Sequence, residues 1–196
     1  MTKNRKTNND DVILSTLENG KNITIKDYRR FIKENNKSAI AEMFFHRLYS
    51  RYLKSFTFKN PIYRKDYKNG FAIMANCCLC IEALQSFKNG WGKTPKGGGR
   101  IFDNFFNGAT KLNGFSKKDF YKHVRCGILH QGETTGGWRI KRAGSLLENK
   151  VINATKFLDE LHKELNLYAE ELRNSEWKSK TWDKYRVKMK KIIKSC

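Results

Sequence analysis

The 196-residue sequence is poor in proline and in acidic residues, and the shortage of proline already excludes two classes of protein. Only two prolines and 14 glycines occur, which argues against a loop-rich or collagen-like chain. Aromatic residues make up 13% of the chain and hydrophobic residues 39%, so an intrinsically disordered protein is not expected. The length suits one domain, with or without extensions, and is sufficient for a hydrophobic core that folds without a disulfide or a metal.

Acidic residues are scarce because 19 Asp plus Glu stand against 40 Lys plus Arg, which leaves a formal net charge of +21. A charge of this size points to a polyanionic partner, with nucleic acid as the first expectation and an anionic membrane surface as the second. A genome rich in A and T also encodes lysine and asparagine often. Composition alone therefore leaves a codon bias without function as the alternative.

The chain also lacks an apolar segment of the kind that exports a protein or anchors it in a membrane. Residues 1–9 are polar and basic, and they do not form a secretory signal. The most apolar run, residues 71–87, is 17 residues long and contains Asn76 and Glu82, which makes it too short and too polar for a membrane span. We therefore expect this run to be a buried helix, and the protein to be cytoplasmic without a membrane partner.

Five cysteines are present, and their spacing does not match a metal site. Cys77, Cys78 and Cys80 lie together in the apolar run, whereas Cys126 and Cys196 stand alone. A structural zinc site needs two pairs of ligands, and no second pair follows. The four histidines show no shared metal-ligand spacing either. The expectation is reduced thiols in the core, with no metal and no other cofactor.

Apolar residues recur at helical spacing along most of the chain, and no stretch longer than a few residues alternates with period two. The pattern predicts an all-α fold with four principal helices and short extra helices. The first helix is expected over residues 38–55, the second over 71–87 with Gly90 as its left-handed cap, and the third over 116–132. The fourth is expected over residues 145–173, where apolar residues spaced by three and four form a heptad seam. The seam consists of Leu147, Val151, Ala154, Leu158, Leu161, Leu165, Tyr168 and Leu172.

These elements divide the chain into three parts. Residues 1–37 are polar and rich in Asn and Lys, and we expect an N-terminal arm with one short element. Residues 38–173 carry the four principal helices and form the helical domain. Residues 174–196 hold eight basic and two acidic residues, a net charge of +6, interleaved with apolar residues. This basic C-terminal extension is expected to be an amphipathic helix.

A glycine-rich stretch, G-W-G-K-T-P-K-G-G-G-R, covers residues 90–100. It is not a nucleotide-binding P-loop, because it follows a helix rather than a strand and lacks the first glycine of that motif. Lys93, Lys96 and Arg100 line the loop and are candidate contacts to a nucleic acid. A plain surface connector is the alternative.

The most informative stretch is R-C-G-I-L-H, residues 125–130, near the expected end of the third helix. His130 can exchange a proton near neutral pH with a 2′-hydroxyl or a leaving oxygen. Arg125 presents a fixed fork of donors that holds a phosphate and stabilises the charge developing on it. On an ideal helix the two side chains differ by about 140°, so they are expected to converge if the helix unwinds near Gly127 or Gly132. A pair that only caps the helix is the alternative.

The sequence F-Y-K-H-V-R-C-G-I-L-H-Q-G-E-T, residues 120–134, resembles the signature helix of HEPN domains (higher eukaryotes and prokaryotes nucleotide-binding), whose motif is R-x4-6-H. The apolar helix that contains residues 77–87 and the segment G-W-R-I at 137–140 are also similar to uncharacterised bacterial members of that group. The resemblance extends over residues 38–172. It implies an HEPN-like helix bundle that forms a homodimer, so that two R-x4-6-H motifs share one cleft.

The resemblance also implies an activity. Many HEPN domains are metal-independent endoribonucleases, in which the 2′-hydroxyl attacks the adjacent phosphorus and leaves a 2′,3′-cyclic phosphate and a 5′-hydroxyl. On this chain Arg125 would stabilise the phosphate and His130 would be the general acid or base. Such domains recur in toxin–antitoxin and phage-defence systems, so the expected partners are RNA, a second copy and an antitoxin or defence-system protein. Cys126 replaces the polar residue that often follows the arginine.

Two other functions remain open on the sequence. The departure at Cys126 and the basic extension favour a non-catalytic module that binds nucleic acid or a nucleotide. The heptad seam favours a helical interaction protein, such as a toxin half that an antitoxin neutralises. The endoribonuclease is the preferred interpretation because it also accounts for the arginine and histidine together.

Several further residues are candidates to support the site. Glu82 is the only charge in its apolar helix, and a buried carboxylate needs a partner, so it is expected to orient Arg125. A surface glutamate bonded to solvent or Lys88 is the alternative. The remaining candidates are Gln131 and Glu133, which flank His130 and could set its tautomer, and the phosphate contacts Lys122 and Arg139.

Overall fold

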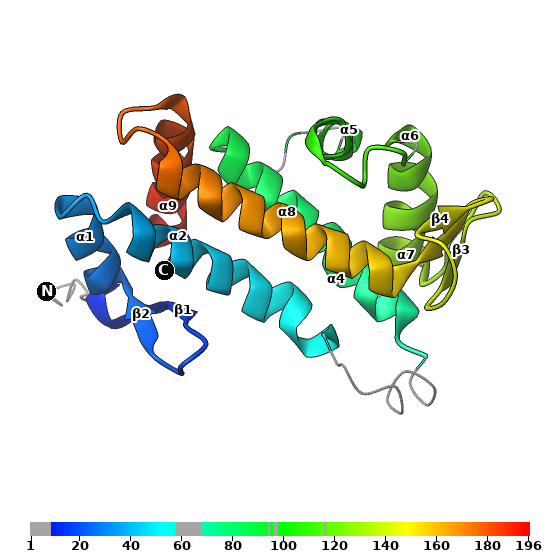
Figure 1. Cartoon of the computed structure of the whole chain (residues 1–196), viewed down its shortest axis with the longest axis horizontal. Helices are drawn as coiled ribbons and strands as arrows, with labels where there is room; N and C mark the ends of the chain where they lie inside the picture. Colours follow the sequence, from blue (N-terminus) through cyan, green and yellow to red (C-terminus); the bar gives the residue numbers. More distant parts are fainter. Residues whose placement is uncertain (1–8, 58–67, 94, 96–97, 116) are drawn as a thin grey trace, which may run out of the picture.

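The chain is mainly helical, as the sequence predicts, but two small β-sheets are also present (Figure 1). The structure is a computed structural model that describes residues 9–57, 68–93, 95, 98–115 and 117–196. The prediction of a purely all-α fold is therefore wrong. The strands are only two to four residues long, too short for an alternating pattern to reveal them in the sequence.

Eight α-helices carry most of the described chain. Their bounds are α1 Ile25–Lys33, α2 Lys37–Leu48, α4 Gly70–Asn89, α5 Gly99–Gly108, α6 Lys117–Asp119, α7 Cys126–Gln131, α8 Ala154–Asn174 and α9 Lys180–Lys194. A π-helical turn, Tyr49–Leu53, extends α2, and a second one, Phe120–Arg125, joins α6 to α7. Short 3-10 turns cover Asn9–Asp11 and Lys54–Phe56. The helix expected over 38–55 is thus present, although its last turns are not α-helical.

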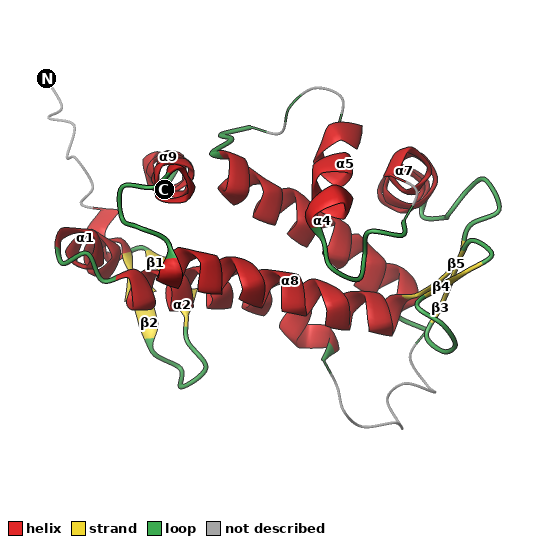
Figure 2. Cartoon of the chain, turned by 45° about the horizontal axis from the view of Figure 1, so that its top comes forward, coloured by secondary structure: helices red, strands yellow, loops and turns green. Residues whose placement is uncertain are grey.

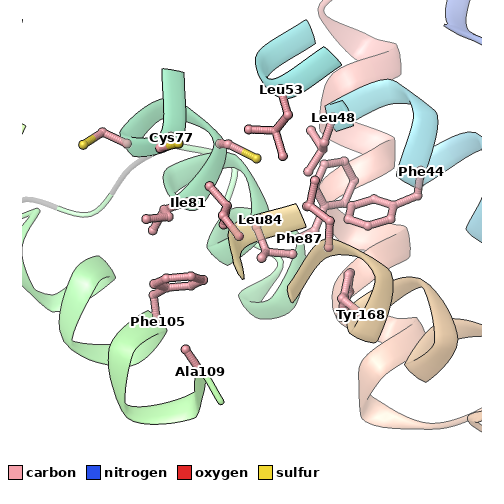
Figure 3. Close-up of a cluster of buried hydrophobic side chains, with 14 of the residues drawn as sticks. Phe44, Leu48, Leu53, Cys77, Ile81, Leu84, Phe87, Phe105, Ala109 and Tyr168 are labelled. Atoms are coloured by element: carbon pink, nitrogen blue, oxygen red, sulfur yellow. The ribbon is translucent and has the colours of Figure 1, made fainter. Parts of the chain in front are cut away.

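Helix α4 is the central element and packs against α8, α9 and α5. Figure 3 shows its Leu84 and Phe87 in one cluster with Phe44 of α2 and Tyr168 of α8. The Phe44 ring meets both Phe87 and Tyr168 edge-on with centroids 5.0 Å apart, a geometry that aromatic pairs favour. At 20 residues α4 is long and apolar enough to cross a membrane, so the prediction that it is too short and too polar to do so is wrong, but 56% of its most apolar window is buried inside the fold. The expected buried helix is confirmed.

The three cysteines of α4 are buried, free thiols in this core. Burial raises the pKa of Cys77, Cys78 and Cys80 above the ordinary thiol value, so all three stay protonated and unreactive. The prediction of reduced core thiols is confirmed for these residues. The helix ends at Gly90, whose φ of 67° is the left-handed conformation expected of its cap.

Helix α8 begins nine residues later than the sequence predicts, at Ala154 instead of residue 145. The preceding residues form a hairpin whose turn places Asn149 and Lys150 at positive φ, which a helix cannot accommodate. Asn153 then starts the helix, because its side chain accepts a hydrogen bond from the Lys156 amide. The first two residues of the expected heptad seam therefore lie in strands. The buried remainder of the seam is Ala154, Leu158, Leu161, Leu165, Tyr168 and Leu172.

The two sheets lie near opposite ends of α8 (Figure 2). One is an antiparallel pair of β1, Ile13–Thr16, and β2, Asn22–Thr24. The other has the order β3-β5-β4, in which β5 pairs in parallel with β3 and antiparallel with β4. The bounds of these three strands are β3 Arg139–Lys141, β4 Leu147–Glu148 and β5 Val151–Asn153. The second sheet therefore connects the segment after α7 to the start of α8.

The N-terminal part holds more structure than the single short element that the sequence predicts. The hairpin β1–β2 leads directly into α1, and both β1 and α1 pack against α2. Arg47 of α2 is buried and donates a hydrogen bond to the Leu14 carbonyl of β1. This bond ties the hairpin to α2, so the described part of residues 9–37 contributes to the same core as α2. The proposed boundary at residue 37 stays a prediction.

The C-terminal extension contains the expected amphipathic helix, α9. Ser179 caps it by accepting a hydrogen bond from the Trp182 amide. The Trp182, Tyr185 and Met189 side chains are fully buried, and α9 packs on α4. The basic side chains occupy the other faces of the helix, so α9 fixes part of the excess positive charge beside the end of α4.

Candidate active site

Arg125 and His130 lie on one continuous helical segment, at the boundary of a π-helical turn and α7. The Cys126 amide donates to the Tyr121 carbonyl five residues back, which defines the π-helical turn that ends at Arg125. Such turns occur often at functional sites, since they re-aim the side chains that follow. The segment ends at Gly132, where φ is 72° and the amide donates to Ile128. The helix runs through Gly127 without unwinding, and the end expected at Gly132 is confirmed.

The two motif side chains meet directly. Arg125 Nη1 lies 3.1 Å from His130 Nε2. Five residues rise about 7.5 Å along a helix, and the long guanidinium side chain spans that interval. An arginine can only donate, so a hydrogen bond between these two atoms uses Nε2 as the acceptor, which corresponds to the tautomer with the proton on Nδ1. His130 is exposed, which leaves its ring accessible to a ligand.

Glu82 of α4 orients the arginine from the other side. Its Oε1 accepts a hydrogen bond from Arg125 Nε at 2.8 Å, and the side chains of the pair are only 16% and 18% exposed. Burial opposes the charge on Arg125, but the hydrogen bond and the negative charge of Glu82 outweigh it, so the pKa of Arg125 is raised above its ordinary value. The contact expected between Glu82 and Arg125 is present, and the guanidinium stays charged. Lys88 instead lies over the Tyr168 ring, with its Nζ 5.5 Å from the centroid.

Tyr121 covers a third side of the arginine, and the sequence reasoning missed it. The Arg125 guanidinium carbon lies 5.7 Å from the centre of the Tyr121 ring, within range of a cation–π contact. Burial, together with a contact to Cys126, raises the pKa of Tyr121, so the phenol stays neutral. Gly98 packs on the same ring, since a Cβ there would lie 2.8 Å from the tyrosine hydroxyl. The spacing of Tyr121 and Arg125, four residues apart on a helix, was the signal that could have identified this contact.

The chain after α7 folds back over the motif and requires Gly127. A Cβ on Gly127 would lie 2.4 Å from the Glu133 carbonyl oxygen, a distance that real Cβ atoms essentially never show. The returning chain is fixed by the Glu133 amide, which donates to the Gly127 carbonyl, and by the Thr135 hydroxyl, which lies 2.8 Å from His123 Nδ1. Gly127 and His123 therefore have structural roles beside the site. The tight return explains why glycine stands inside the motif.

The other predicted site residues are less closely placed. Gln131 and Glu133 are exposed, and within the described part of the chain neither side chain hydrogen-bonds to His130. Lys122 lies on the π-helical turn and Arg139 on β3, at the end of the molecule that holds α7 (Figure 1). The exposed predicted nucleic-acid contacts are Lys93, Arg100, Lys122 and Arg139. Lys96 lies outside the described residues, as does Ser116, the expected cap of the third helix.

The chemistry that this arrangement offers is proton transfer beside a fixed cation. Among the residues that the structure describes, no group of three or more His, Cys, Asp or Glu side chains is arranged to hold a metal ion. A metal-independent reaction stays a prediction. Cys126 is a half-buried free thiol next to the arginine. The described geometry therefore consists of a carboxylate, a guanidinium and an imidazole in one line of hydrogen bonds.

Searches of protein-family models, of curated proteins and of solved structures find no match to this chain. The resemblance to HEPN domains thus stays a prediction. A proposal for the function of this chain therefore depends on the geometry around Arg125 and His130.

Proposed function

We propose that this chain is an endoribonuclease of the HEPN type that cleaves RNA without a metal ion. The observation that supports the proposal is the line of hydrogen bonds from Glu82 through Arg125 to His130. A pair that served only to cap a helix would bond the last carbonyls of that helix. Here the guanidinium instead joins two side chains from different elements, at the protein surface and with an accessible imidazole.

The reaction needs one group that moves protons and one that holds the phosphate. Once Arg125 Nη1 turns from His130 Nε2 to the phosphate, that nitrogen of His130 can accept the 2′-hydroxyl proton while the 2′-oxygen bonds to phosphorus and the bond from phosphorus to the 5′-oxygen breaks. The departing 5′-oxygen takes up a proton from a water molecule or a second histidine, which leaves a 5′-hydroxyl and a 2′,3′-cyclic phosphate. Arg125, held by Glu82, places positive charge where the phosphate oxygens gain negative charge. Because Glu82 holds the Nε end of the arginine before RNA binds, only its Nη1 end has to turn toward the phosphate.

A second copy of the chain would supply the second histidine that such a reaction can use. Helix α4 exposes Leu79 one turn from Glu82, with 40% of the residue accessible. Ala72, Ala75 and Ala83 lie on the same face of the helix, together with the polar Asn76. Covering this face with its own copy would bring two Arg125–His130 pairs close together. A homodimer in the cytoplasm, with an antitoxin or defence-system partner, belongs to the same proposal.

The experiment that tests the function is RNA cleavage in EDTA by the purified protein. We expect single-stranded RNA to be cut to products with 2′,3′-cyclic phosphate and 5′-hydroxyl ends, and an all-deoxy strand to remain intact. His130→Ala and Arg125→Ala should each lower the rate about 10²- to 10⁴-fold, the range of a lost acid–base or charge-stabilising group. Identical cleavage by both variants and the unaltered chain would contradict the proposal, because a contaminating nuclease would then explain the products.

The matched control is His123→Asn, on the same helical segment. His123 contacts Thr135 rather than Arg125, and asparagine retains a hydrogen-bonding group near that hydroxyl. We expect this variant to keep most of the cleavage rate. If no variant or wild-type sample cuts RNA but RNA binds with a steep salt dependence, the non-catalytic binding module is the better description.

A further inference from the structure

The end of α4 and the end of α9 enclose a surface hollow of about 590 Å³ that the candidate active site does not use. Its lining includes Trp91 and Lys93 from the glycine-rich loop, and Lys191 and Lys194 from α9. Figure 1 shows α9 near one end of the molecule and α7 near the other. The hollow is therefore separate from the Arg125–His130 pair.

Two glycines allow the loop to lie close against α9 at the hollow. A Cβ on Gly90 would lie 3.1 Å from the Lys184 carbonyl oxygen, and one on Gly92 would lie 2.3 Å from the Lys191 side chain. The Trp91 amide donates to the Ser86 carbonyl at 2.9 Å, which fixes the tryptophan directly after the helix. The glycine-rich loop thus has a structural reason for its first glycines, and the result is an aromatic residue among lysines.

The positive charge of the hollow exceeds what the helix ends can neutralise. Within the described residues, none of its three lysines forms an ion pair with a carboxylate. Each helix C-terminus contributes about half a negative elementary charge, so α4 and α9 together offset about one of three charges. Burial and the nearby positive charges of Lys191 and Arg47 lower the pKa of Lys188, one turn away, which agrees with an excess of positive charge here.

We propose that this hollow binds the backbone of single-stranded RNA and anchors the substrate at a distance from the cleavage site. Lysines that face a polyanion and an aromatic surface on which a base can stack are the combination found in proteins that hold single strands. Trp91 supplies the aromatic surface, and Lys93, Lys191 and Lys194 supply the phosphate contacts. This inference rests on the proposed function, since RNA is the strand to be held.

The test measures binding apart from cleavage, with a fluorescent 2′-O-methyl oligonucleotide that lacks the attacking hydroxyl. Binding is titrated by anisotropy over a range of salt concentrations. The double variant Lys191→Ala/Lys194→Ala should bind about tenfold more weakly, and the slope of log K against log salt should fall by about 1.4, or about 0.7 for each lost contact. Trp91→Leu should weaken binding several-fold without a change of slope, since stacking releases no counterions.

The matched control is Lys178→Ala/Lys180→Ala, which removes the same charge from two exposed lysines, one just before α9 and one at its first residue. Equal losses in the two double variants would overturn the proposal, because net charge alone would then explain binding. Equal affinity for polyglutamate would also overturn it, in favour of an acidic protein partner.

Two further outcomes distinguish this proposal from the proposed function. If the hollow variants lose binding while the wild-type protein never cuts unmodified RNA, RNA binding in the hollow is supported and the endoribonuclease activity is contradicted. If His130-dependent cleavage occurs while the hollow variants bind RNA like the wild type, the activity is supported and RNA binding in the hollow is contradicted.

Discussion

Helix α4 connects two regions that differ in whether their positive side chains are balanced by a nearby carboxylate. At Glu82 the guanidinium of Arg125 has a carboxylate at 2.8 Å and an imidazole at 3.1 Å, and the ion pair is largely shielded from water. At Gly90, eight residues or about 12 Å further along the helix, the lysines of the hollow have no acidic partner among the described residues. The first region holds the Arg125 side chain in the orientation that the proposed reaction requires. The second region attracts a polyanion through positive charge, which does not depend on a precise orientation of the lysines.

The difference shows why net charge is a poor guide to a catalytic site. The excess of basic residues lies mostly in exposed side chains, whose fields act over about a Debye length of 8–10 Å and weaken with salt. The one arginine that matters most for the proposed reaction contributes nothing to the excess, since Glu82 balances it. Salt should therefore weaken RNA binding far more than it weakens the orientation of Arg125.

Among the variants that compare the two regions, Arg125→Lys should have the largest effect, because it keeps the positive charge but loses the planar guanidinium with its several donors. A lysine cannot bond Glu82 and reach His130 at the same time, so we expect cleavage to fall about 10²- to 10³-fold. Binding of the 2′-O-methyl oligonucleotide should be nearly unchanged, because the hollow is intact. Arg30→Lys, on an exposed residue of α1, is the control. An Arg125→Lys protein that retained full activity would show that positive charge alone suffices at this site.

The next prediction compares the loss of stability caused by alanine at Gly127 and at Gly92, two glycines that another segment of the chain approaches closely. Gly127→Ala should destabilise the fold by about 1–3 kcal/mol, because its Cβ would meet the backbone oxygen of Glu133. Gly92→Ala should cost less than about 0.5 kcal/mol, since it meets only the flexible end of Lys191. Urea denaturation of both variants provides the measurement. Equal losses would mean that the loop at Gly92 is as rigid as the return over α7.

A smaller effect is expected from Glu82→Gln, which keeps a hydrogen-bond acceptor for Arg125 but removes the balancing charge. Glu82 is a positioning residue, so we expect kcat to fall about tenfold while KM changes little. Glu82→Ala should lose more, and the glutamine variant should recover part of that loss. If both variants kept the wild-type rate, the ion pair would serve stability alone.

The smallest effect concerns His162, which belongs to neither region. Its ring stacks on Tyr49 with centroids 4.8 Å apart, and burial lowers its pKa below 6.5, despite the opposing charge of Asp159. The unfolded chain then binds more protons than the folded one, so the stability contributed by neutral His162 is full above pH 6.5 and declines as the pH falls. His162→Phe should remove this part of the pH dependence of the melting temperature and leave the pH profile of cleavage unchanged. An unaltered stability profile in the variant would assign the dependence to another group.

The elements that the sequence predicted correctly are those that depend on residues close together in the sequence or on the general cost of burying a charge. The apolar periodicity identified α4 and most of α8, Gly90 was predicted as a left-handed cap, and the third helix was expected to end at Gly132. The contact of Glu82 with Arg125 followed from the cost of a lone carboxylate in an apolar helix. Each of these inferences needed only neighbouring residues or one general rule about burial.

The features that escaped depend on contacts between distant segments. Strand β5 forms because β3, twelve residues earlier, pairs with it in parallel, and two three-residue strands leave no periodic signal. The same pairing explains why residues 145–153 are not helical. The glycines at 92, 98 and 127 face Lys191, Tyr121 and Glu133, and no spacing rule predicts such close approaches. The π-helical turn was also invisible, because one extra residue in a turn changes no residue type.

That π-helical turn sets the phase of the motif relative to the core. Each residue added to or removed from a helix rotates everything after it by about 100°. Phe120 and Val124 face the core before the turn ends, and Ile128 does so after it, so the extra residue lets both stretches keep their apolar side inward. A homologous chain one residue shorter between 120 and 125 would retain R-x4-H intact and still point its arginine away from Glu82. The spacing within the motif therefore does not define the site unless the helical register that carries it is also preserved.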